Sequence, residues 1–307
     1  MILGIDPKVD YAFKHLFGRE ATRPILIDLL DNILDPGPGR EIRDLELLNP
    51  FNPKEALDDK LSILDIKARD QSGRQFNVEM QMVASRYFEK RILYYGVRLY
   101  QQQLHEGQDY LELKPTISIS FLDHVLFGQV PDYHLRFRLL EASHHFPLTE
   151  DMEFHILELP KFTRPVAELA SSLETWLYFL RGAEKIDTEA VPAALQKQPM
   201  VMRALEELKM LAQSDLERER YEARRKALLD YNTGLKVARM EGREEGRTEG
   251  REEGRTEGEK IGVIGTIHFC ECLLHRQETS TEQLVSLSLE DLSRLADELQ
   301  AQVLKQR

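Results

Sequence analysis

The sequence has 307 residues, of which 42% are hydrophobic and 31% are charged, and this composition is that of a soluble globular protein with a charged helical portion. It contains no apolar run of the roughly 20 residues that span a bilayer, no signal-peptide pattern at the N-terminus and no disulfide framework in its two cysteines, so we expect a cytoplasmic protein with no membrane partner. The net charge of −12 argues against non-specific coating of nucleic acid, but a nuclease is not excluded, because positive charge can be confined to one cleft.

The first half of the chain alternates between helical and strand-like patterns. Residues 8–34 predict two helices, which end at Gly18 and Asp35. A loop containing Pro and Asn then leads into a β-hairpin, and residues 84–106 predict a long helix. Further strand-like stretches lie at 116–123, 134–142 and 153–162. This order predicts an α/β core over residues 1–163, with a mixed central sheet flanked by helices.

The second half of the chain has an all-helical composition. Residues 164–240 are rich in Ala, Leu, Glu, Lys and Arg, and we expect them to pack on the core or extend it. Residues 241–262 repeat glycine at every fourth position, which suits either a charged linker or a helix with one bare stripe, since each Gly costs roughly 1 kcal/mol in a helix interior. Residues 263–307 resume an amphipathic pattern, and we expect an oligomerisation or interaction segment there. The glycines of the repeat are Gly242, Gly246, Gly250, Gly254, Gly258 and Gly262.

The hairpin between the first helices and the long helix has a register that can be worked out from its turn. A three-residue loop with Gly73 in the left-handed conformation pairs Asp70 with Arg74. Counting outward at constant register then places Asp65 opposite Glu79, because each residue lies five positions beyond its end of the turn. A one-residue bulge would break this alignment.

The polar face of this hairpin has two interpretations. Alternation at period two puts Gln81 on the face of Glu79, and Lys67 on the face of Asp65. Directly opposed carboxylates destabilise a strand pair, whereas Mg²⁺ binds one or two carboxylates together with waters and phosphate oxygens. The pattern therefore suits a metal site, but it also suits an ordinary solvated sheet face, and spacing alone leaves both open.

Several stretches together resemble a known family. They are DYAFKHLFG at 10–18, LSILDIKARDQSGRQFNVEMQ at 61–81, RILYYGVRLYQQQLHEGQDYLELKPTISISFLD at 91–123 and LELPKF at 157–162, together with the Glu/Gly/Arg repeat. These stretches resemble the Rpn family of recombination-promoting nucleases, also labelled transposases, within the PD-(D/E)XK nuclease superfamily. The resemblance covers nearly the whole chain. It implies a restriction-endonuclease-like core before the helical C-terminal region, and hydrolysis of DNA that depends on Mg²⁺ or Mn²⁺.

The resemblance also implies roles for individual residues. Carried over by position, Asp65 and Glu79 are the metal ligands, and the carbonyl of Met80 is a candidate third ligand. Gln81 stands where the wider superfamily has Lys, and this departure matters. A neutral amide orients a water, but it supplies no positive charge and accepts no proton.

Four further residues are candidates at the site. Asp10 matches an acidic residue on the first helix that completes such sites, although a helix-start residue paired with Lys14 is equally consistent with the sequence. Lys60, Lys67 and Arg91 are candidates for contacts to the DNA backbone or for charge in the transition state. For each of these three cations a solvated surface position is the competing interpretation.

We therefore expect a metal-dependent DNA endonuclease that hydrolyses phosphodiester bonds by in-line attack of water, with a role in recombination, mobile elements or defence. Double-strand cleavage with one site per chain favours a homodimer or a higher homo-oligomer, formed through the C-terminal helices. The alternative is a catalytically inactive, transposase-related protein that acts as an oligomeric interaction module.

Overall fold

The computed structural model describes residues 1–49, 65–84 and 86–305, and the side chain of Asp65 lies outside this description. The chain divides into two compact units, Met1–Leu229 and Asp230–Arg307. Each unit has a hydrophobic core of its own. Among the helices of the described residues, none is both long and apolar enough to cross a bilayer.

A six-stranded mixed sheet lies at the centre of the first unit, in the order β1-β2-β3-β4-β6-β5. The pairs β1–β2, β2–β3 and β5–β6 are antiparallel, whereas β3–β4 and β4–β6 are parallel. The α/β fold predicted from the sequence is confirmed, and the short edge strand β1 is an addition, because three residues carry too little alternation to be recognised. The strands are β1 (Leu45–Leu47), β2 (Asp65–Asp70), β3 (Gln75–Gln81), β4 (Thr116–Leu122), β5 (His134–Arg138) and β6 (Met152–Glu158).

Helices make up most of the rest of the chain. The first two end where the sequence predicts, at Gly18 and at Asp35 in a left-handed conformation. Side-chain hydroxyls cap several others, as at Ser171, which accepts the backbone N–H of Glu174 at 3.2 Å. The α-helices are α1 (Asp10–Phe17), α2 (Arg23–Leu34), α3 (Phe88–Gln101), α4 (Ser172–Gly182), α5 (Ala193–Gln196), α6 (Pro199–Gln213), α7 (Asp215–Leu273), α8 (Thr281–Val285) and α9 (Leu289–Lys305). Short 3₁₀ turns occur at Glu20–Thr22, Tyr110–Glu112, Leu159–Lys161, Val166–Glu168 and Ala183–Lys185.

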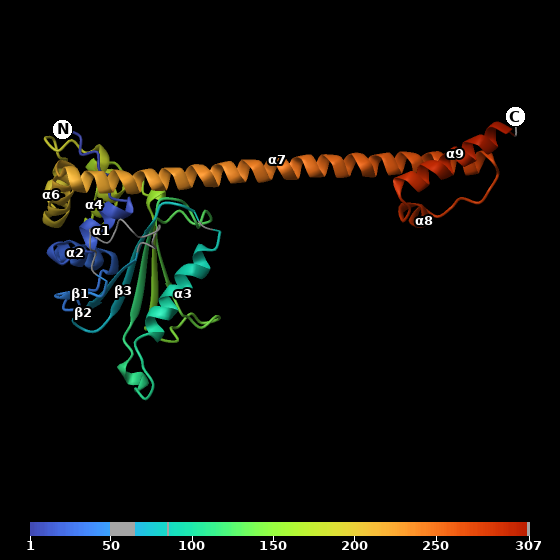
Figure 1. Cartoon of the computed structure of the whole chain (residues 1–307). Helices are drawn as coiled ribbons and strands as arrows, with labels where there is room; N and C mark the ends of the chain where they lie inside the picture. Colours follow the sequence, from blue (N-terminus) through green and yellow to red (C-terminus); the bar gives the residue numbers. More distant parts are fainter. Residues whose placement is uncertain (50–64, 85, 306–307) are drawn as a thin grey trace. The chain divides into compact units, whose positions relative to one another are not determined.

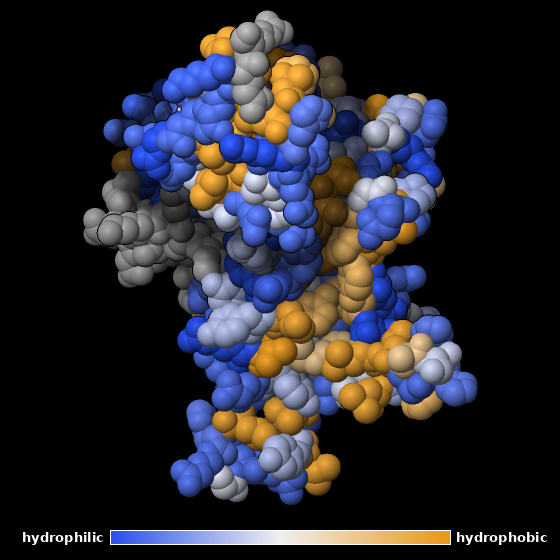
Figure 2. All heavy atoms as spheres, turned by 90° about the vertical axis from the view of Figure 1, so that its right-hand side faces the viewer, coloured by the Kyte–Doolittle hydropathy of each residue, from blue (hydrophilic) through white to orange (hydrophobic). Residues whose placement is uncertain are grey.

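Helix α3 covers one face of the sheet, and helices α1, α2, α4 and α6 cover the other (Figure 1). Helix α3 approaches the sheet closely because it has a glycine at the contact. A Cβ on Gly96 would lie 2.7 Å from Cε1 of Phe154 on β6. The outer side of α3 is itself partly apolar, since the side chains of Leu93 and Val97 are half exposed. Orange residues interrupt the hydrophilic surface on this side of the molecule (Figure 2).

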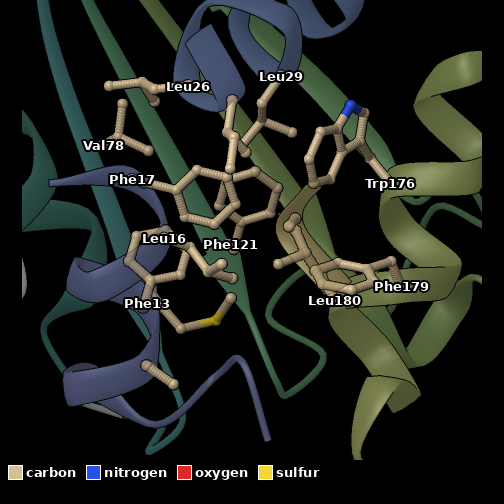
Figure 3. Close-up of a cluster of buried hydrophobic side chains, with 14 of the residues drawn as sticks. Phe13, Leu16, Phe17, Leu26, Leu29, Val78, Phe121, Trp176, Phe179 and Leu180 are labelled. Carbon is tan, nitrogen blue, oxygen red and sulfur yellow. The ribbon is translucent and has the colours of Figure 1, made fainter. Parts of the chain in front are cut away.

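The opposite face of the sheet is packed with large apolar side chains. The ring of Phe121 on β4 contacts Phe13 on α1, with 6.1 Å between their centroids, and Phe17 lies 5.9 Å from Trp176 of α4. Figure 3 shows these rings converging from α1, β4 and α4. Every second residue of the central strands is buried in this cluster, namely Ile66, Ala68, Phe76, Val78, Met80, Ile117 and Ile119. The described residues of the hairpin therefore alternate between this apolar face and the face that carries Glu79.

The turn of the β2–β3 hairpin is the three-residue loop that the sequence predicts. Gly73 has φ of +89° and the backbone N–H of Asp70 donates to the carbonyl of Arg74 at 3.0 Å. The Asp70 carboxylate accepts from the backbone N–H and hydroxyl of Ser72 at 2.9 and 2.8 Å and pairs with Arg74 Nε at 2.6 Å. These bonds fix the register of the two strands from the turn outward.

The glycine repeat lies within the continuous helix α7, so of the two conformations left open by the sequence it adopts the helical one. A Cβ placed on any of its glycines would meet no atom within 4 Å. In the second unit the end of α7 packs against α8 and α9 through a small core that includes Ile267, Leu284 and Leu292. Ser288 caps α9 by accepting the backbone N–H of Asp291 at 3.1 Å.

Candidate metal centre

The carboxylate of Glu79 is buried on β3, on the face that α3 covers, and the residue is only 1% exposed. Its Oε1 accepts the hydroxyl of Ser120 on the neighbouring strand at 2.7 Å, and its Oε2 accepts Nε2 of Gln81 at 3.1 Å. Nη2 of Arg91 on α3 lies 3.9 Å from the same Oε2. A solvated sheet face is therefore the wrong description of this position.

The strand register brings Asp65 to Glu79. The two residues are direct partners across β2 and β3, followed by the pairs Ile66 with Val78 and Lys67 with Asn77. The predicted alignment, with no bulge between the turn and Asp65, is confirmed. The backbone thus places the first residue of β2 beside the buried carboxylate.

Two of the other predicted residues, Met80 and Lys67, lie in different surroundings. The side chain of Met80 is buried in the apolar core on the opposite face, so only its backbone carbonyl is a candidate ligand. Lys67 is half-buried on β2, where its backbone N–H donates to Oδ1 of Asn49 at 2.6 Å. Lys60 lies outside the described residues.

Asp10 starts α1 at the edge of the first unit's core. Its Oδ1 accepts the backbone N–H of Tyr11 at 2.7 Å, and its Oδ2 lies 3.9 Å from Nη1 of Arg224 on α7. Among the hydrogen bonds and ion pairs of the described residues, none joins Asp10 to Glu79. The structure brings Glu79, Gln81 and Arg91 into contact and gives Asp10 a different ionic partner.

Sequence reasoning missed Ser120, which braces the buried carboxylate. The alternation in TISISFL shows that the serines of β4 share one face. What the alternation does not reveal is the parallel register that sets Ser120 beside Glu79. Such a pairing across 41 positions has no local signal in a single sequence.

A second charged cluster, also missed, joins the start of the chain to the end of β4. Nζ of Lys8 lies 3.1 Å from Oδ1 of Asp123, and 3.8 Å from Oδ2 of Asp6. Burial raises the pKa of Asp6 to about 6, against the opposing effect of Lys8. The backbone N–H of Asp123 donates to the carbonyl of Gln81 at 2.9 Å, so the cluster adjoins the same end of β3.

The donor chemistry of the described residues fits a hard divalent cation. Carboxylate oxygens are the preferred ligands of Mg²⁺ and Mn²⁺, and ligating carboxylates are usually held by further hydrogen bonds. Glu79 has this arrangement, because Ser120 and Gln81 each donate to one of its two oxygens. Within the described residues there is no group of three or more His, Cys, Asp or Glu side chains that would bind a metal. The ligand set therefore depends on Asp65, whose position is given by the register alone.

Comparison with known proteins identifies the family of the chain. The family model described as PD-(D/E)XK nuclease family transposase matches residues 7–238. No curated protein and no solved structure matches the chain. The match spans more than half of the sequence and includes all six strands and the buried carboxylate. The mixed sheet with flanking helices is that expected for the resemblance, and the chain belongs to the PD-(D/E)XK nuclease family transposases.

Proposed function

We propose that the chain is a DNA endonuclease that depends on a divalent cation, Mg²⁺ or Mn²⁺. The observation that carries this proposal is the strand pairing of Asp65 with Glu79. The carboxylate of Glu79 is buried, and each of its two oxygens accepts a hydrogen bond. Burying a carboxylate is costly unless it is paired and hydrogen-bonded. A buried, hydrogen-bonded carboxylate beside a second acidic residue favours a cation site over a purely structural role.

In the proposed site Asp65, Glu79 and the carbonyl of Met80 would hold the cation. When bound, a divalent cation stabilises charge on the phosphate oxygens and lowers the pKa of a water that attacks the phosphodiester. Ser120 and Gln81 keep the Glu79 carboxylate in one orientation, so little reorganisation is needed. The Gln81 amide orients a water but takes no proton from it.

Nicking of a supercoiled plasmid tests this proposal. Purified full-length chain is incubated with Mg²⁺, with Mn²⁺ and with EDTA, beside the variants Asp65→Ala and Glu79→Gln. We expect cleavage that requires the metal and that falls by at least about a hundredfold in either variant. Glu46→Gln is the matched control, because Glu46 is an exposed carboxylate on β1 that pairs with Arg69, and its loss leaves nicking unchanged.

Metal-independent cleavage, or full cleavage by both variants, would contradict the proposal. If folded wild-type protein cuts no plasmid, linear duplex or single strand with either metal, the alternative function gains support. The chain would then be a catalytically inactive relative of transposases that acts through its helices as an oligomeric interaction module.

We further propose that the chain forms a homodimer through α7. The glycine stripe of the repeat is flanked on one side by the residues that follow each glycine, and on the other by the residues that precede it. The first flank is basic at Arg243, Arg247, Arg251 and Arg255, whereas Glu259 and Val263 follow the last two glycines. The second flank is acidic at Glu241, Glu245, Glu249, Glu253 and Glu257, whereas Ile261 precedes the last glycine. The arginines and glutamates of both flanks are exposed in the single chain.

These flanks are self-complementary in one orientation only. A twofold axis parallel to two facing helices sets the arginine flank of each against the glutamate flank of the other. An axis perpendicular to the pair sets like charges together on both sides, which costs energy. The bare stripe allows close approach, and its four-residue spacing suits helices that cross rather than run strictly parallel. We therefore expect a dimer in which both α7 helices point the same way.

Light scattering and energy transfer test the dimer and its orientation. We expect twice the chain mass for the full-length protein, and a monomer when the four flanking arginines are changed to glutamate. A dye on the exposed Cys272, with Cys270 buried, reports the orientation. Helices pointing the same way bring the two dyes together, whereas opposed helices centred on the repeat separate them by about 60 Å. A full-length monomer, or weak transfer in a dimer, would refute this part.

A further inference from the structure

Arg91 has two buried donors beside the candidate metal centre. Its side chain as a whole is 29% exposed, but its Nε and Nη2 are buried and have no hydrogen-bond partner among the described residues. The 3.9 Å between Nη2 and Oε2 of Glu79 is an ion-pair distance but is too long for a hydrogen bond. Leaving a buried donor without a hydrogen bond destabilises the folded state, and more so when the donor is charged, so such donors are rare without a functional reason.

The two unsatisfied nitrogens are a matched pair. Nε and Nη2 form the side-on fork of a guanidinium, whose parallel N–H groups fit two oxygens of one phosphate. Arg91 is a cation paired with Glu79 across α3 and β3. Gln81, which donates to the same Oε2 at 3.1 Å, is neutral. Arg91 therefore sets a positive group beside the acidic centre.

The guanidinium is held in place by aromatic packing. Its Cζ lies 5.3 Å from the centroid of the Phe88 ring, one turn earlier on α3. The ring of His124, which follows β4, meets Phe88 edge-on at 6.5 Å and 86°. Burial lowers the pKa of His124, so the imidazole is neutral at pH 7 and does not repel the arginine. Such packing gives Arg91 a fixed orientation before any ligand arrives.

The neighbouring acidic groups are engaged elsewhere. Glu158 accepts the backbone N–H of Phe127 at 2.9 Å and pairs with Lys161. Asp123 is bound by Lys8. The fork of Arg91 is thus not drawn away from Glu79 by these carboxylates.

We propose that Arg91 is the catalytic cation of this site and that its Nε–Nη2 fork stabilises negative charge on the phosphate oxygens in the transition state. The inference rests on the proposed nuclease function and names the residue that supplies the charge which Gln81 lacks. Helix α3 thereby contributes the positive group to a site whose acidic groups come from β2 and β3. Because charge builds mainly in the transition state, Arg91 acts on the rate of cleavage more than on DNA affinity.

The test moves the cation from α3 to β3. Single-turnover cleavage of a labelled duplex at saturating protein is measured with Mg²⁺ for Arg91→Gln, Arg91→Lys and the double variant Arg91→Gln/Gln81→Lys. We expect Arg91→Gln to lose about 10²–10³-fold in rate. Arg91→Lys keeps the charge but not the fork and recovers part of the rate. In the double variant the lysine starts beside the same Glu79 oxygen, so it recovers at least about tenfold over Arg91→Gln.

Measurements without metal separate this role from others. Binding of the same duplex in EDTA, at several salt concentrations, should change less than about threefold for Arg91→Gln, whereas a plain backbone contact lowers the salt slope by about 0.9. Thermal melting confirms that each variant is folded. Arg98→Gln is the matched control, because Arg98 is an exposed cation two turns further along α3, and we expect it to leave rate and binding unchanged.

Each outcome decides the inference. It is overturned if folded Arg91→Gln cleaves within a few-fold of wild type, if rate and DNA affinity fall together with the salt slope, or if the double variant gains nothing. If wild-type protein itself does not cleave, the proposed nuclease function fails and Arg91 has no catalytic role. If wild type cleaves and Arg91→Gln cleaves equally, only the inference about Arg91 fails.

Discussion

The seven residues of β3 alternate between two faces of the sheet that differ in chemistry. Phe76, Val78 and Met80 are fully buried among α1, α2 and α4, where their role is to exclude water. On the other face Asn77 and Glu79 are almost as deeply buried beneath α3, at 3% and 1% exposure, yet they are polar. Apolar burial stabilises the fold roughly in proportion to area, whereas polar burial costs energy unless each group is bonded.

This difference matches the proposed division of roles between the two faces. If the proposed site is correct, changes on the apolar face reduce stability, whereas changes on the polar face reduce activity. A charged cluster adjoins the end of β3, because Asp123 pairs with Lys8 and its backbone N–H donates to the carbonyl of Gln81.

The largest expected effect lies on the apolar face. Phe121→Ala removes a fully buried ring from the cluster with Phe13, and we expect it to lower the free energy of unfolding by about 3–5 kcal/mol. Urea denaturation measures the loss. Tyr110→Ala is the control, since Tyr110 is 82% exposed and its loss should stay within about 0.5 kcal/mol. Equal losses of unfolding free energy in the two variants would show that the buried ring of Phe121 stabilises the fold no more than an exposed tyrosine does.

The next effect concerns Asp6, in the charged cluster that adjoins the end of β3. Burial raises its pKa from 3.8 to about 6, so between these values the folded state binds more protons than the unfolded state. Stability therefore falls as pH rises from about 4 to about 7, by at most about 3 kcal/mol. Asp6→Asn should flatten this decline in urea denaturation. An unchanged pH profile in the variant would show that Asp6 is not the group responsible.

A methyl group between α3 and the sheet should have a smaller cost. Gly96→Ala places a Cβ 2.7 Å from Phe154 and 3.2 Å from Oγ of Ser118, which forces the helix outward. We expect a loss of about 1–3 kcal/mol in thermal or urea unfolding. Gly234→Ala, where a Cβ meets nothing within 4 Å, should instead stabilise its helix by up to about 1 kcal/mol. A change of unfolding free energy with the same sign in both variants would mean that the packing of α3 on the sheet does not require a glycine at position 96.

The smallest effect separates two serines on one strand. Ser120→Ala removes the hydroxyl that donates to Oε1 of Glu79, and we expect metal affinity to fall about 10–100-fold. Ser118→Ala is its matched control: this serine is equally buried on the same face, and its Oγ has no hydrogen-bond partner among the described residues. Calorimetric titration with Mn²⁺ compares the two. A loss of affinity in both, or in neither, would argue against Ser120 as the brace.

Local signals in the sequence were sufficient for much of this structure. The turn chemistry around Gly73 predicts the register of Asp65 with Glu79, because turn type and alternation act over a few residues. The contacts of Ser120 and Arg91 with Glu79 depend on how separate elements pack. The sequence offered Arg91 as one of three candidate cations, but it did not show which of them lies beside Glu79. Likewise the glycine repeat has a weak helical tendency of its own, so periodicity alone left its conformation open.

The most direct test of the central claim is a calorimetric titration of the full-length chain with Mn²⁺ in the absence of DNA. We predict one binding event per chain that is lost in Asp65→Asn and in Glu79→Gln and retained in Glu46→Gln. This result would mean that the paired carboxylates of β2 and β3 hold the cation. Unchanged binding in Asp65→Asn and Glu79→Gln would contradict the account, because the buried carboxylate would then be part of the packing beneath α3 and not a metal ligand.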